Sequence, residues 1–142
     1  MSTRTGIAAL LSLALAGCAT GYGSQGYRGG YYEKAATAKM QWVYFSGNGY
    51  VTADVISKYG LYRCAELAQA QHKPHFVIYE RLVDAARDRP ADAPNTGLIG
   101  NKPFAAALLM TLDEPRYGSK STQQVLDELE SFVHPQSAKA TP

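Results

Sequence analysis

The chain lacks the residue patterns that usually mark enzyme chemistry. It contains no G-x-S-x-G and no H-E-x-x-H motif, and only two cysteines among its 142 residues. An enzyme needs a nucleophile with its base, a pair of catalytic carboxylates or a metal, and none of these has a recognisable motif in this sequence. We therefore predict that the protein is not an enzyme and that it has no catalytic residue, no cofactor and no metal site.

An excess of charge of one sign is also lacking. Lys and Arg together number 14 against 12 for Asp and Glu, which leaves a formal net charge of +2. A protein that binds nucleic acid normally carries a much larger positive surplus, gathered in a basic patch. We therefore predict no nucleic-acid partner.

Long hydrophobic runs are rare, and the N-terminal one covers only residues 7–15. This run is too short to cross a bilayer core of about 30 Å, and Arg4 precedes it, which is typical of an export signal. It ends in Leu15-Ala16-Gly17-Cys18, a pattern that resembles the lipobox of bacterial lipoproteins. The resemblance implies that residues 1–17 are a lipoprotein signal peptide, cleaved before Cys18. An ordinary signal peptide followed by an incidental cysteine is the alternative.

The lipobox resemblance also implies an anchor and a location. Cys18 would become the lipidated N-terminus, and several acyl chains hold a domain at a membrane more firmly than one chain does. Ala19, rather than Asp, follows the cysteine, which implies the outer membrane of a Gram-negative envelope, with the domain facing the periplasm. Cys64 then remains as the single thiol, so no intramolecular disulfide can form and Cys64 is either buried or reactive.

A segment rich in Gly, Tyr and Ser follows the lipobox and holds almost no aliphatic side chains. Such a segment buries too little apolar surface to offset the entropy lost on ordering. We therefore predict that residues 18–35 form a flexible tether from the lipidated cysteine. Residues 36–134 are expected to form a single α+β domain, and residues 135–142 a disordered tail.

Periodicity and capping residues predict the elements of this domain. Thr52 is a candidate N-cap, and Ser121, with Gln124 three places on, forms a capping-box pattern. The Pro- and Gly-rich stretch over residues 84–102 is expected to be a long exposed loop. The apolar run over residues 104–112 favours a strand, with a helix as the alternative. The expected elements are strands over 40–45, 75–79 and 104–112 and helices over 53–71 and from Ser121 to His134.

The order β-α-β-β-α predicts an α+β fold, a two-layer sandwich with a three-stranded mixed sheet and two helices on one face. Strand alternation places Val43 and Phe45 beneath the helices and turns Trp42 and Tyr44 toward the open face. Exposed aromatic side chains concentrate binding energy, so Trp42 and Tyr44 are the candidate interaction face. The alternative is that the tether or the long loop folds back over this face.

The domain also resembles a known family. The residues that carry the resemblance are Phe45, Gly47, Asn48, Thr52, Leu61, Arg63, Ala65, Glu66, Leu67, Phe76 and Val77, with the stretch over 117–129. They are similar to a family of small Gram-negative outer-membrane lipoproteins of unknown function, which implies no particular activity. The resemblance marks Arg63 and Glu66, which lie three residues apart on one helix, and implies a contact with Asn48 or the Gly-rich turn that is structural or binds a ligand.

Two departures from the family pattern bear on the sites. Cys64 stands where a small residue is expected, which predicts a packing site of alanine size. His72 and Lys73 replace the Gly-Tyr pair that usually ends the helix. His72 and His75 are three residues apart and on one helix could share a metal, but Pro74 ends the helix between them. No metal site is therefore predicted.

These observations predict a non-enzymatic envelope lipoprotein, tethered at the outer membrane as a protein-interaction or structural module. Its expected partners are membrane lipid through Cys18 and an envelope protein. The alternative function is peptidoglycan binding, because Arg63-Cys64-Ala65 resembles the Arg-Ala step of domains that bind the wall peptide. Those domains also need an Asp-bearing loop, and Gly47-Asn48-Gly49 offers an amide in its place.

Overall fold

The computed structural model describes residues 20–135. The predicted signal peptide, Cys18 and most of the predicted tail lie outside these residues. The elements are β1 (Gly30–Ala35), β2 (Met40–Ser46), α2 (Ala53–Ala70), β3 (His75–Tyr79), α3 (Leu82–Ala86), β4 (Asn95–Ile99), β5 (Lys102–Leu112), β6 (Lys120–Ser121) and α4 (Thr122–Val133).

One antiparallel sheet organises the domain, in the order β1-β2-β5-β3-β6, with β4 also paired to β5. The eleven-residue β5 is its central strand. Along one edge β5 pairs with β2, and along the other it pairs with β4 and then with β3. The apolar run over residues 104–112, for which a helix was the alternative, is therefore a strand. β5 is long because three strands, β2, β3 and β4, pair with it.

The predicted fold class was wrong. The sheet has six strands rather than three, and every pairing is antiparallel rather than mixed, because β5 lies between β2 and β3. The described chain also holds a third helix, α3, and residues 95–99 of the predicted loop form β4. The strands near residues 40–45 and 75–79 and the two long helices were predicted correctly.

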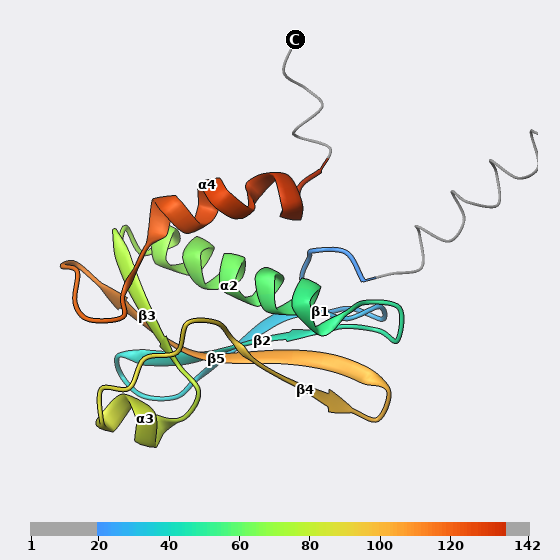
Figure 1. Ribbon diagram of the computed structural model, residues 1–142, viewed down its shortest axis with the longest axis horizontal. Helices are drawn as coiled ribbons and strands as arrows, with labels where there is room; N and C mark the ends of the chain where they lie inside the picture. Colours follow the sequence, from blue (N-terminus) through green and yellow to red (C-terminus); the bar gives the residue numbers. More distant parts are fainter. Residues whose placement is uncertain (1–19, 136–142) are drawn as a thin grey trace, which may run out of the picture.

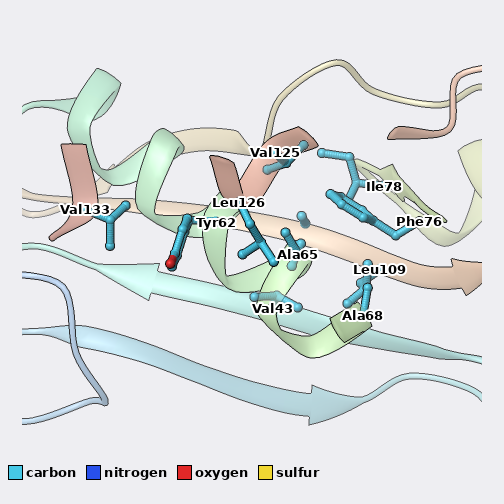
Figure 2. Packing of buried hydrophobic residues seen from close by; sticks show 12 residues of the cluster. Val43, Tyr62, Ala65, Ala68, Phe76, Ile78, Leu109, Val125, Leu126 and Val133 are labelled. Atoms are coloured by element: carbon cyan, nitrogen blue, oxygen red, sulfur yellow. The ribbon is translucent and has the colours of Figure 1, made fainter. Parts of the chain in front are cut away.

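The helix-facing side of the sheet carries the main core. Figure 1 shows α2 and α4 on this side and α3 on the other. α2 presents small buried side chains to the sheet, among them Cys64, Ala65 and Ala68, so its axis lies close to the strands. Figure 2 shows Val125 and Leu126 of α4 pointing toward α2 and completing this cluster. These side chains form a continuous apolar core between helices and strands.

The opposite side of the sheet is only partly covered. Val77, Tyr79 and Leu108 form a second, smaller cluster, against which Trp42 and Ala85 of α3 pack. The predicted alternation is confirmed, because Val43 and Phe45 are buried on the helix side and Trp42 packs on the other. α3 covers the part of this side near β3.

The predicted tether differs most from the structure, since residues 20–35 belong to the domain. Residues 30–35 form β1, which pairs with β2 along its whole length. Gly29 and Gly30 have φ values of 100° and 131°, and a Cβ on either would overlap a backbone carbonyl oxygen. The glycines thus fix a tight backbone path into β1 and do not make the segment flexible, as their number in the sequence had suggested.

Helix α2 ends in a Schellman motif. The amide of Lys73 donates to the Ala68 carbonyl at 2.9 Å, and that of His72 donates to the Gln69 carbonyl at 2.9 Å. This motif needs a left-handed residue, and His72 takes that role with φ of 55°. A side chain with a Cβ pays a steric penalty in this conformation that glycine avoids.

We therefore expect His72→Gly to stabilise the domain, by about 1 kcal/mol, because the left-handed conformation costs glycine little. Urea unfolding of both proteins measures the difference. Gln71→Gly is the matched control: Gln71 has φ of −89°, so glycine there gains nothing and only adds entropy to the unfolded chain. A lower stability in His72→Gly than in the parent would contradict the interpretation.

Candidate functional site

The strongest polar cluster in the described chain is centred on Arg63 of α2. Its Nε donates to Glu33 Oε1 of β1 at 2.7 Å, and its Nη1 donates to Glu66 Oε2 at 3.0 Å. The guanidinium carbon also lies 4.0 Å from the centre of the Tyr31 ring. Burial alone would lower the pKa of Arg63, but hydrogen bonds to the two carboxylates outweigh burial and raise it. Arg63 therefore fastens β1 to α2.

Tyr22 completes this cluster from the N-terminal segment. Its hydroxyl donates to Glu66 Oε2, the same carboxylate oxygen that accepts from Arg63. Burial and the neighbouring Glu66 carboxylate raise the pKa of Tyr22 well above its usual value. The phenol stays protonated and remains a donor at any physiological pH.

The Tyr22 ring fills a pocket of other rings. The centroids of five neighbouring rings lie between 5.3 and 6.0 Å from the centroid of Tyr22, and most of these rings are tilted or edge-on to it. The five rings belong to Tyr31, Phe45, Tyr59, Tyr62 and His134. Such pairs stabilise a structure beyond the area that they bury. Tyr22 thus holds the N-terminal segment against β2, α2 and the end of α4. No pattern in a Gly/Tyr tract distinguishes this tyrosine from its neighbours.

Asn48 contacts the N-terminal segment and the turn before α2. Its amide donates to Thr20 Oγ1 at 2.8 Å, and its side-chain Oδ1 accepts from the Tyr50 amide at 3.0 Å. Arg63 and Glu66 contact each other as their spacing predicted, but their further partners are Glu33, Tyr22 and Tyr31. These partners were not predicted, because they lie within residues 18–35, for which a flexible tether was predicted.

Cys64 is fully buried in the main core, with no exposed surface. Burial raises the pKa of its thiol from 9.0 to about 12, so the thiolate that would act as nucleophile does not form at neutral pH. The predicted packing role at Cys64 agrees with this position among Ala65, Ala68 and Leu109.

We expect the Cys64 thiol to react with a maleimide only after denaturation, because the folded protein buries it.

The burial of Cys64 also makes the free energy of unfolding depend on pH. Above pH 9 the thiol of the unfolded chain ionises while the thiol of the folded chain stays protonated, so the free energy of unfolding falls as the pH rises toward 12. The loss is about 1.4 kcal/mol per pH unit per group. Cys64→Ala should remove this contribution. If urea unfolding shows the same fall in the free energy of unfolding between pH 9 and 10 in Cys64→Ala as in the parent, the interpretation is contradicted.

Cys64→Ala itself is expected to fold and to lose about 1 kcal/mol or less at pH 7, because an alanine-sized site collapses around a small deletion. Rapid labelling of the native thiol would instead point to a redox role.

Of the two histidines considered as metal ligands, His72 follows the end of α2 and His75 begins β3. His72 and His75 line one shallow hollow together with Gln69, Ser121 and Gln123. Within residues 20–135, no group of three or more His, Cys, Asp or Glu side chains is placed to hold a metal ion.

The candidate interaction face extends further than Trp42 and Tyr44. On the side of the sheet away from α2, Tyr32 of β1 stacks on Tyr44 with centroids 4.8 Å apart, and Trp42 stacks on Tyr44 at 6.0 Å. Tyr32 is 44% exposed. We call Tyr32, Tyr44 and Trp42 the aromatic face. Tyr32 was not predicted to belong to this face, because residues 18–35 were predicted to form a flexible tether.

Comparison with family models, with curated proteins and with solved structures finds no match for this chain. The resemblance to small outer-membrane lipoproteins therefore stays a prediction. Among the helices of residues 20–135, none is long and apolar enough to cross a membrane.

Proposed function

We propose that this protein is a non-enzymatic lipoprotein of the outer membrane, anchored through Cys18 and facing the periplasm, which binds another envelope protein through the aromatic face. The observation that carries the proposal is the stack of Tyr32, Tyr44 and Trp42 on the side of the sheet opposite α2 and α4. Stacked aromatic rings on a rigid sheet offer contact area at a low entropic cost, and such residues dominate binding energy at interfaces.

The chemistry of the described residues favours binding over catalysis. The only described thiol is buried, and the Arg63 cluster satisfies its charges internally through Glu33 and Glu66. Each carboxylate already accepts a hydrogen bond from the guanidinium, so a substrate would have to displace one of them. This arrangement supports a structural role for the cluster.

Peptidoglycan binding is supported less well for the same reason. A wall peptide would have to present its carboxylate to Arg63, but Nε and Nη1 already donate to Glu33 and Glu66, and the Tyr31 ring lies against the guanidinium.

The anchor is tested with Cys18→Ser. This change should leave an unprocessed precursor and abolish incorporation of a palmitate analogue, because the lipidated thiol is lost. Normal cleavage and labelling in the variant would end the lipoprotein proposal.

The aromatic face is tested by photocrosslinking in cells. A photoreactive phenylalanine analogue at Tyr32 should give a discrete protein adduct. The same analogue at Phe132 is the control, because Phe132 is similarly exposed, at 37%, but lies on α4 on the other side of the sheet. Equal adducts at both positions, or none at Tyr32, would count against the proposal. Cosedimentation with purified sacculi would favour the wall binder.

A further inference from the structure

The described chain begins at one end of the sheet and is held there. Thr20 is only 4% exposed; its Oγ1 donates to the Arg28 carbonyl at 2.6 Å and accepts from the Asn48 amide at 2.8 Å. Figure 1 shows this start beside the beginning of β1 and at the same end of the sheet as the turn from β4 to β5. Residue 20 is therefore a fixed point of the domain.

The distance from this fixed point to the lipidated cysteine is short. Cys18 precedes Thr20 by two residues, and consecutive Cα atoms are 3.8 Å apart, so the Cα of Cys18 lies within about 8 Å of that of Thr20. Two covalent steps set this upper limit on the distance between Cys18 and Thr20. If Cys18 carries acyl chains, this end of the sheet lies against the membrane.

The side chains exposed at this end are suited to that position. Four large hydrophobic side chains are found here: Tyr27 is 105% exposed, Tyr50 76%, Leu98 70% and Ile99 71%. Tyr27 and Tyr50 line one hollow with Arg28 and Lys102, while Ile99 lines the adjoining one. Exposed aliphatic and aromatic side chains together with cationic ones are typical of surfaces that lie at the lipid headgroup boundary.

The turn from β4 to β5 makes the most prominent part of this surface. Leu98 and Ile99 are consecutive in β4, so they point to opposite sides of the strand, and both are about 70% exposed. The two residues of the turn are Gly100, with φ of 62°, and Asn101. The Leu98 and Ile99 side chains gain nothing from their exposure to water, but both can insert among lipid headgroups.

We propose that Tyr27, Tyr50, Leu98 and Ile99 form a membrane-contacting end that seats the domain directly on the phospholipid surface without a tether. This inference rests on the proposed lipid anchor. It places the strands upright on the bilayer, with α3 at the far end and the aromatic face to the side, open to a neighbouring envelope protein. The partner is therefore expected to be bound close to the membrane.

The test uses the mature, acylated full chain in phosphatidylethanolamine and phosphatidylglycerol vesicles. In a Cys64→Ala background, an environment-sensitive fluorophore is attached to Ile99→Cys or, as control, to Ala86→Cys, which is exposed on α3 at the far end. Ile99 is 71% exposed, so its replacement leaves the core intact. Circular dichroism confirms that each labelled variant is folded.

We expect the fluorophore at Ile99 to emit at shorter wavelength in vesicles than in detergent-free buffer, and to be quenched several-fold more by headgroup-proximal spin-labelled lipid than the fluorophore at Ala86. Equal quenching at both positions, with palmitate labelling intact, would overturn the membrane-contacting end and leave the lipoprotein proposal standing. Absence of palmitate on the wild-type chain would overturn both.

Discussion

Tyr22→Ala should lower the free energy of unfolding by about 3 kcal/mol, near the lower end of the range for deleting a large aromatic side chain from a core. The Tyr22 ring contacts five other rings, and its hydroxyl donates to Glu66, so the change removes both packing and a charge-assisted hydrogen bond. A flexible tether would give no loss at all. Urea unfolding followed by circular dichroism measures the difference.

Two further variants make this result specific. Tyr22→Phe keeps the ring and loses only the donor to Glu66, so it should cost about 1.5 kcal/mol, the lower end for a hydrogen bond to a charged group. Tyr27→Ala is the matched control from the same Gly/Tyr tract, because Tyr27 is fully exposed and its loss should leave stability within about 0.5 kcal/mol of the parent. Equal effects at Tyr22 and Tyr27 would restore the tether interpretation.

Local patterns predicted the parts of the fold that depend on local physics. Thr52 and Ser121 accept hydrogen bonds from Val55 and Gln124 as N-caps, so both long helices begin where the sequence indicated. The two-residue period of β2 placed Val43 beneath the helices. These features follow from residues that are neighbours in the chain or lie one turn apart.

The missed elements depend on partners that are distant in the sequence. β1 contains few aliphatic residues, and its stability comes from pairing with β2 and from the ion pair between Glu33 and Arg63, thirty residues away. β4 is short and mostly exposed, and only its pairing with β5 identifies it as a strand. Gly100-Asn101 is a two-residue hairpin signal that could have been found from sequence.

The candidate site divides in the same way. The spacing of Arg63 and Glu66 indicated their ion pair, and it is present at 3.0 Å. Their remaining partners, Tyr22 and Glu33, lie in the Gly/Tyr segment, where low hydrophobicity argued against order. Composition alone misleads here, because the Tyr22 ring, the two glycines with positive φ and the pairing of β1 with β2 together order a segment of low hydrophobicity.

Arg63→Met should destabilise the domain by about 2 to 3 kcal/mol. Removing one member of a buried ion pair costs about 3 to 5 kcal/mol because the remaining charge loses its partner. The effect is smaller here since 21% of the Arg63 side chain and 27% of each glutamate stay exposed to water. Methionine retains most of the apolar stem that packs beside Tyr31, so the loss reports mainly on the charges.

A second substitution separates charge from packing. In Arg63→Met combined with Glu33→Gln, one of the two uncompensated carboxylates is neutralised, so part of the stability should return, which a double-mutant cycle measures directly. A pure packing role for Arg63 would give no recovery. If Arg63 instead served to bind a wall peptide, Arg63→Met would lose binding to sacculi while keeping its unfolding midpoint. If Arg63→Met loses stability and Glu33→Gln restores part of it, the charges of the Arg63 cluster are what hold β1, and with it the N-terminal segment, against α2.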